Sequence, residues 1–152
     1  MESIQNILSL EIIWQDPDMV ELKILAANDE FSGATEVYTI YDDICSFIKA
    51  LEKFPKSIRD TVEFSAGRKD SYAYAKMRFY CFTASGHTAG RIKLESNVAT
   101  EFRPEEKNKI ELELQFEAAA LDSFILQLRK IVNNKNGKAV LAGISPYTQN
   151  IA

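Results

Sequence analysis

Residues 71–82, SYAYAKMRFYCF, decide the fold, because two kinds of side chain alternate along them without a break. Side chains that alternate with a period of two point to opposite faces of a β-strand. The stretch therefore predicts a strand with one core face and one outer face that carries tyrosines and cations. The core set is Ala73, Ala75, Met77, Phe79 and Cys81, and the outer set is Tyr72, Tyr74, Lys76, Arg78, Tyr80 and Phe82.

The same alternation continues on the C-terminal side of this strand. After an Ala-Ser-Gly turn at residues 84–86, residues 88–95 alternate and complete a hairpin with residues 71–82. Residues 109–117 place apolar side chains between glutamates and other polar groups. A shorter strand is expected at residues 61–66, and residues 96–107, which contain Pro104, are expected to form a loop.

The N-terminal part predicts three more strands, at residues 8–14, 20–26 and 34–40, joined by polar turns at 16–18 and 28–30. In the first of these strands, Leu8, Leu10, Ile12 and Trp14 are expected to share one face.

Two segments instead have the helical period, with apolar residues at i, i+3, i+4 and i+7. The first spans residues 42–54, with Asp42 as the expected N-cap and Pro55 ending the helix. The second spans residues 118–132. Their apolar stripes are Ile44, Phe47, Ile48 and Leu51 in the first, and Leu121, Phe124, Ile125, Leu128 and Ile131 in the second.

The element order is thus βββ-α-ββββ-α. We expect an α+β fold in which an antiparallel sheet of six to seven strands packs both helices on one face and leaves the other open to water. With 152 residues, one domain is expected, over residues 1–137. Residues 138–152 are expected to be a C-terminal tail, in which residues 139–141 are a candidate edge strand.

Composition narrows the classes of function. The net charge is −4, and nucleic-acid binding usually needs a clustered basic surface, so no nucleic-acid partner is expected. Cys45 and Cys81 form no C-x-x-C pair, which indicates buried, free thiols in a reducing compartment. There is neither a signal-peptide pattern nor an apolar run long enough to cross a membrane, so we expect a cytoplasmic protein without membrane contact.

Known catalytic motifs are missing from the sequence. It has no G-x-G-x-x-G, P-loop or G-x-S-x-G pattern. The single histidine, His87, follows a predicted turn, and Cys81 faces the predicted core, so neither a Cys/His pair nor a metal site is expected. Glu111, Glu113 and Glu117 share a strand face and could act in acid–base chemistry, but a solvated outer face explains them better. We therefore expect no catalytic residue, metal or cofactor.

The outer face of the sheet is the candidate site. Tyrosine and arginine are enriched at binding hot spots, so this face is a candidate recognition surface for a protein partner. A salt-bridged, merely solvated sheet surface is the alternative interpretation. The candidate residues are Tyr72, Tyr74, Lys76, Arg78, Tyr80, Arg91, Lys93, Glu111 and Glu113.

The layout also resembles that of small bacterial immunity proteins of the WapI type and related families. The resemblance lies in Trp14-Gln15-Asp16, in residues 31–36 and in the closing strand–helix unit at residues 111–130. It implies a stoichiometric inhibitor that binds a toxin encoded nearby, since immunity proteins often present acidic surfaces to basic nuclease toxins. No functional residue carries over from this resemblance.

Three hypotheses follow. The first is a non-enzymatic protein-binding module, immunity-like, acting through the outer face. The second is a small-ligand-binding or regulatory domain that uses the same tyrosine-lined face as a pocket. The third is an enzyme with a site around Tyr74, Arg78 and His87. A homodimer formed through the same face would resemble the first.

Overall fold

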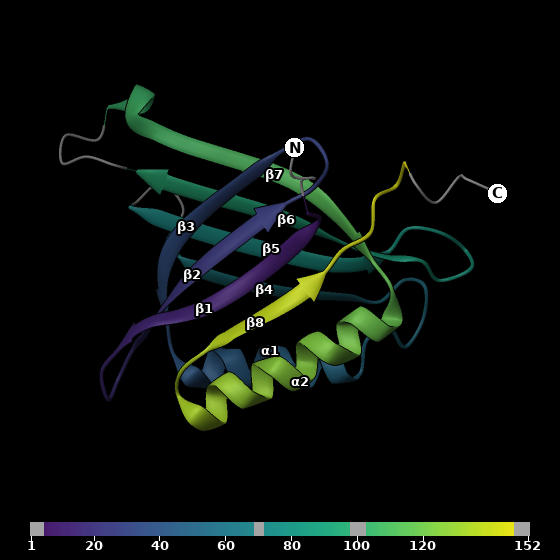
Figure 1. Ribbon diagram of the computed structural model, residues 1–152, viewed down its shortest axis with the longest axis horizontal. Helices are drawn as coiled ribbons and strands as arrows, with labels where there is room; N and C mark the ends of the chain where they lie inside the picture. Colours follow the sequence, from purple (N-terminus) through teal and green to yellow (C-terminus); the bar gives the residue numbers. More distant parts are fainter. Residues whose placement is uncertain (1–4, 69–71, 98–102, 148–152) are drawn as a thin grey trace.

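The structure is a computed structural model that describes residues 5–68, 72–97 and 103–147 (Figure 1). Eight strands and two helices make up this part of the chain, and a 3-10 turn, η1 (Pro104–Glu106), precedes β7. The strands are β1 (Ile7–Gln15), β2 (Val20–Ala27), β3 (Ser32–Thr39), β4 (Thr61–Gly67), β5 (Ala73–Cys81), β6 (Thr88–Asn97), β7 (Lys107–Phe116) and β8 (Lys138–Ala142). The helices are α1 (Tyr41–Glu52) and α2 (Ala118–Asn134).

The strands form two antiparallel sheets of four strands each, which we call sheet A (order β3-β2-β1-β8) and sheet B (order β4-β5-β6-β7). The α+β class is confirmed, but the expected single sheet of six to seven strands is wrong. Alternation along the sequence identifies the core face of each strand and says nothing about which strands share a sheet. Two sheets bury two apolar faces against a common core, which a single open sheet cannot do.

The candidate edge strand at residues 139–141 is present as β8, which pairs with β1 at the edge of sheet A. Leu141 faces Leu8 and Ala139 faces Leu10 in this pairing, and all four side chains are fully buried. The segment that follows the second helix therefore contributes Ala139 and Leu141 to the core.

Both apolar helix stripes predicted from the sequence are buried, in one core shared with both sheets. Helix α1 lies against β4 and α2 against β8, so each helix covers an edge strand of a different sheet. Figure 1 shows the two helices next to each other, along the side of the molecule where the edge strands β4 and β8 lie. Phe47 of α1 joins the layers, because its ring contacts Phe64 of β4, Phe79 of β5 and Phe124 of α2.

Hydrogen bonds between described residues join the two sheets away from the helices. Thr35 Oγ1 of β3 donates to the carbonyl oxygen of Glu95 in β6 at 2.9 Å, and Asn28 Nδ2 donates to that of Glu113 in β7 at 3.1 Å. The backbone N–H of Ile144, just beyond β8, donates to the carbonyl oxygen of Gln115 at 2.8 Å. Sheet A therefore lies against the inner face of sheet B, where the two sheets share the core.

Trp14 does not share the face of Leu8, Leu10 and Ile12, contrary to the expectation from the sequence. The register between β1 and β2 shifts between Ile12 and Trp14, as in a β-bulge. An extra residue in one strand reverses the faces of all residues after it. Trp14 is consequently half exposed, and its ring packs edge-on against Tyr38 with centroids 6.0 Å apart.

Two local expectations are also corrected. The N-cap of α1 is Ile40 and not Asp42, which lies in the first turn, where its charge favours the helix dipole. Cys45 and Cys81 are free, as expected, but half-buried rather than buried.

The expected loop at residues 96–107 is shorter than predicted. β6 continues to Asn97 and β7 begins at Lys107, while residues 98–102 lie outside the described residues. Within the described ranges, neither helix has the length and apolar character needed to cross a membrane.

Candidate functional site

The outer face of sheet B carries most of the candidate residues, arranged in rows across its four strands. One row reads Glu63, Arg78, Arg91 and Glu113 from β4 to β7, and the next reads Ser65, Lys76, Lys93 and Glu111. The hairpin of β5 and β6 thus places Lys76 opposite Lys93 and Arg78 opposite Arg91. We call these four side chains the cationic centre.

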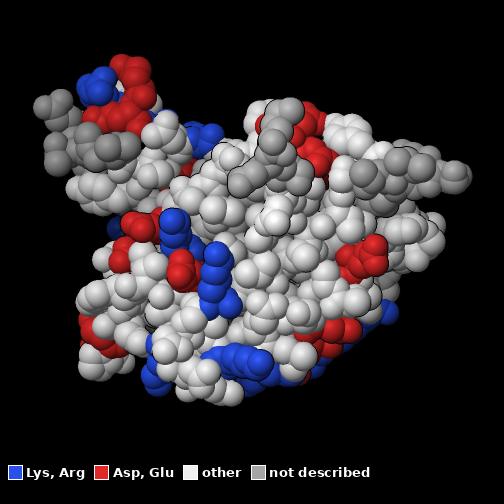
Figure 2. All heavy atoms as spheres, viewed as in Figure 1, with Lys and Arg blue, Asp and Glu red and all other residues white. Residues whose placement is uncertain are grey.

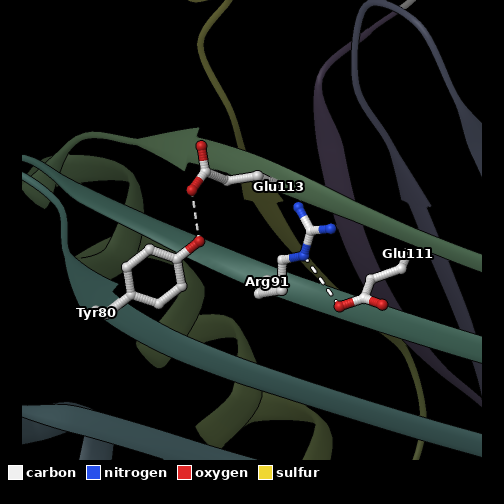
Figure 3. Close-up of polar contacts among 4 residues, drawn as sticks. All are labelled: Tyr80, Arg91, Glu111 and Glu113. Carbon is white, nitrogen blue, oxygen red and sulfur yellow. Dashed lines mark hydrogen bonds and ion pairs between the residues drawn. The ribbon is translucent and has the colours of Figure 1, made fainter.

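A hydrogen bond across three strands fixes one side of this centre. Tyr80 Oη of β5 donates to Glu113 Oε2 of β7 at 2.5 Å, and Figure 3 shows the ring spanning β6. Ala89 faces Tyr80 on β6 and is completely buried, since its small side chain lets the ring lie across it. The pKa of Tyr80 is raised above its usual value, mainly by desolvation and to a smaller extent by the hydrogen bond to Glu113. The hydroxyl therefore stays protonated and acts as a donor.

The two arginines are held in different ways. Arg91 Nε lies 3.0 Å from Glu111 Oε2, and both side chains are nearly half exposed (Figure 3). The Arg78 guanidinium lies over the Tyr80 ring, 4.7 Å from its centroid, where the ring face attracts a cation. The orientations of Arg78, Tyr80 and Arg91 are thus set by contacts within the chain itself.

The two lysines differ from the arginines. Among the described residues, neither Lys76 nor Lys93 has a carboxylate within ion-pair distance, although each is half-buried. Lys93 has Glu111 as its register neighbour, but Glu111 binds Arg91 instead.

The remaining tyrosines lie toward the other end of the sheet. Tyr74 faces Glu95 on β6, while Tyr72 precedes β5 and lines a shallow groove with Tyr38 and Ser96. Tyr72 is more than half exposed. The structure therefore unites Tyr80, the cationic centre and the two glutamates of β7, and sets Tyr72 apart from them.

Glu95 is a residue that the sequence did not single out. It lies on the outer face of β6 but is only 2% exposed, and Lys107 Nζ lies 3.0 Å from its Oε1. Its alternation with Arg91 and Lys93 predicts an exposed side chain, so nothing in the sequence signals this burial.

The residues of the hypothetical enzyme site are not brought together. Tyr74 is opposite Glu95 at one end of β6, and Thr88 at the other end is about 23 Å from Glu95 at the usual rise per strand residue. His87 lies one residue beyond Thr88. His87 Nδ1 lies 2.8 Å from Thr83 Oγ1 and 3.1 Å from Ser85 Oγ, within its own turn. In residues 5–68, 72–97 and 103–147, no group of three His, Cys, Asp or Glu side chains is placed to hold a metal ion.

An apolar cavity of about 400 Å³ lies at the end of sheet B where α2 begins. It does not include Tyr74 or Tyr80, so it is separate from the tyrosine-lined face proposed as a pocket from the sequence. Its apolar lining residues include Phe54, Pro55, Phe82, Phe116, Ala118, Leu121 and Ile144.

The outer face of sheet A has a different charge pattern. Its central row reads Glu36, Lys23, Glu11 and Lys138 from β3 to β8, so that every charge faces an opposite one. Figure 2, which shows the side of the molecule formed by sheet A and α2, has positive and negative groups interspersed there.

No protein-family model, curated protein or solved structure matches this chain. The geometry of the outer face of sheet B is therefore the basis for a functional proposal.

Proposed function

We propose that this chain is a non-enzymatic protein-binding module that acts through the outer face of sheet B. The observation that carries the proposal is the fixed arrangement of Arg78, Tyr80 and Arg91, held by Glu111 and Glu113 on a regular sheet. Side chains that are ordered before binding lose less conformational entropy when a partner docks. Tyrosine and arginine are also the residue types enriched among the anchors of protein interfaces.

The finer proposal concerns the partner. The resemblance to WapI-type immunity proteins suggests a toxin encoded nearby, neutralised in the cytoplasm by a stoichiometric complex. A binding role of this kind needs a rigid, complementary surface and no turnover, which agrees with residues positioned by a sheet.

Co-expression of the chain with the products of neighbouring genes tests the proposal, followed by purification of the complex at high salt. A one-to-one complex is expected, and it should be lost when Tyr74 and Arg78 are both replaced by alanine. The matched control replaces Glu11 and Lys138 of sheet A by alanine, which removes two side chains from the other sheet and leaves the groove beside Tyr72 unchanged.

Two outcomes would contradict the proposal. One is a chain that elutes without a bound partner after co-expression with each of the neighbouring gene products. The other is a complex that survives the Tyr74 and Arg78 replacements but is lost with the sheet A control. Sedimentation of the chain alone separates a homodimer through this face from a complex with another protein.

A second candidate function rests on the apolar cavity beside α2. Its volume falls in the range of small-molecule sites, and its lining includes the rings of Phe54, Phe82 and Phe116. Anilinonaphthalene sulfonate, an apolar fluorescent probe, is expected to bind there and to be excluded by Ala118→Trp, which puts an indole at the cavity wall. Equal probe fluorescence with both proteins would count against a ligand site here.

A further inference from the structure

The cationic centre places two pairs of like charges directly opposite each other on neighbouring strands. Like charges directly opposite each other on antiparallel strands destabilise a sheet. Lys76 faces Lys93, and Arg78 faces Arg91, so both central rows of sheet B contain such a pair. Sheet A avoids this arrangement, because its charged row alternates in sign from Glu36 to Lys138.

Carboxylates of the chain itself neutralise only part of this charge. Within the described residues, Arg91 alone of the four cations has a carboxylate partner, Glu111. Arg78 lies over a tyrosine ring, and Glu113 accepts the hydroxyl of Tyr80. Lys76 and Lys93 therefore retain the capacity to bind an added anion.

We propose that the cationic centre binds an acidic segment of a protein partner, which places one carboxylate between Lys76 and Lys93 and a second between Arg78 and Arg91. This inference rests on the proposed function and specifies the chemistry of the partner. The two rows lie two residues apart along the strands, about 6.6 Å. Carboxylates at alternate residues of an extended segment have the same spacing.

The glutamates on either side limit what can bind. Glu63 and Glu113 flank the arginine pair, and Glu111 flanks the lysine pair. The cationic zone is thus two strands wide, roughly 5 Å between its columns, which suits a single peptide segment. Basic groups of the same partner on either side would meet these glutamates, and the resulting charge pattern would set its register.

The flanking carboxylates also argue against a nucleic acid. Four cations and three glutamates leave a local charge of only +1, on a chain with a net charge of −4. Nucleic-acid affinity depends on neutralising several phosphates along a continuous basic track. The carboxylates would repel phosphates beyond the first two, whereas a peptide can carry its negative charges at the centre alone. This chemistry differs from the basic toxin surface that the resemblance implies.

The test uses nuclear magnetic resonance of the full isotope-labelled chain, titrated with a peptide of alternating glutamate and serine. Amide shifts are expected along β5 and β6, with the affinity reduced at least about tenfold by Lys76→Gln combined with Arg78→Gln. The control combines Lys23→Gln with Lys138→Gln, which removes the same charge from sheet A and should leave the affinity unchanged. The corresponding lysine–serine peptide should not bind.

Three results would overturn this inference. They are no shifts with the acidic peptide, an equal loss of affinity in the sheet A control, and tighter binding of single-stranded oligothymidylate than of the peptide. The proposed function is judged separately by the co-expressed complex. The complex could form and keep its full affinity when the chain carries Lys76→Gln and Arg78→Gln. A partner would then exist, but the proposal that it binds through an acidic segment would be wrong.

Discussion

Tyr80 and Glu113 are hydrogen-bonded across the whole width of β6, with Tyr80 Oη 2.5 Å from Glu113 Oε2 and Ala89 buried beneath the ring. The bond orients the ring face on which the Arg78 guanidinium lies. One tyrosine thereby couples the outer strand β7 to the arginine pair of the candidate site.

Tyr80→Phe should change how stability depends on pH. The pKa of Tyr80 is raised in the folded chain, chiefly by desolvation and then by the bond to Glu113, so above about pH 10 the unfolded chain releases a proton that the folded chain retains. This linkage lowers the free energy of unfolding as pH rises through and beyond that value. The variant lacks this contribution, so urea midpoints measured from pH 8 to 11 should fall less steeply than in the wild type.

At neutral pH the same variant should be less stable by about 1 kcal/mol, through loss of the hydrogen bond. Tyr74→Phe is the control, because it removes a hydroxyl from the same strand without touching Glu113. A Tyr80→Phe chain with the pH profile of the wild type would show that the pKa of Tyr80 is not raised in the folded chain.

Lys76→Glu should stabilise the chain and impair the candidate site. The substitution replaces a like-charge pair with Lys93 by an opposite-charge pair, worth roughly 0.2–1 kcal/mol. Lys76→Gln, which only removes the repulsion, should give a smaller gain. Thermal unfolding at low salt measures both, and the gains should shrink as salt screens the charges. A destabilised Lys76→Glu chain would contradict the cost assigned to the cationic centre.

Gln127 should protect the edge of sheet A. Its side-chain amide accepts from the backbone N–H of Val140 at 2.9 Å and donates to the carbonyl oxygen of the same residue at 3.2 Å, as a neighbouring strand would do. Gln127→Leu leaves both groups without a partner, so a loss of roughly 1–3 kcal/mol is expected. Hydrogen exchange at the Val140 amide should accelerate.

Ser123→Ala provides the control for that experiment. Ser123 Oγ accepts a hydrogen bond from Gln127 Nε2 at 3.1 Å, so this variant removes a partner of Gln127 and keeps the amide that bonds to Val140. Val140 exchange that is equally fast in both variants would assign the protection to α2 packing and not to the amide.

Gly67→Ala should destabilise the chain more than Gly86→Ala. Both glycines have positive φ, 77° at Gly67 and 92° at Gly86, so each substitution carries the left-handed backbone cost of roughly 1–2 kcal/mol. A Cβ at Gly67 would also overlap the carbonyl oxygen of Ala73, whereas a Cβ at Gly86 meets nothing. Denaturant unfolding of the two variants isolates the steric part, and equal losses would contradict the close approach at Gly67.

Trp14 should behave as an exposed fluorophore. It is the single tryptophan of the chain, and 47% of it is exposed on the outer face of sheet A. Acrylamide should quench it efficiently in the folded state, and unfolding should shift its emission little. Blue-shifted, poorly quenched emission would instead indicate that Trp14 points into the core, and the register shift after Ile12 would then be wrong.

Much of the local structure could be predicted because it depends on short-range periodicity. The alternation from Ala73 to Cys81 and the stripe from Leu121 to Ile131 each identify a buried face within one element. The bulge after Ile12 was missed because an extra residue leaves the pattern of apolar residues unchanged in Leu8, Leu10, Ile12 and Trp14. The candidate residues on β5 and β6 could be grouped, since a tight hairpin fixes which residues face each other.

The sequence by itself determined the elements, their buried faces and the tyrosine- and cation-rich outer face of one hairpin, because side-chain periodicity and turn chemistry act over a few residues. Only the tertiary structure decided that two sheets share the core, that β8 pairs with β1, and that Glu111 and Glu113 flank the cationic centre. It also decided that Glu95 is buried. These features depend on pairing between distant segments, which is selected by the joint burial of apolar faces and not by any local pattern.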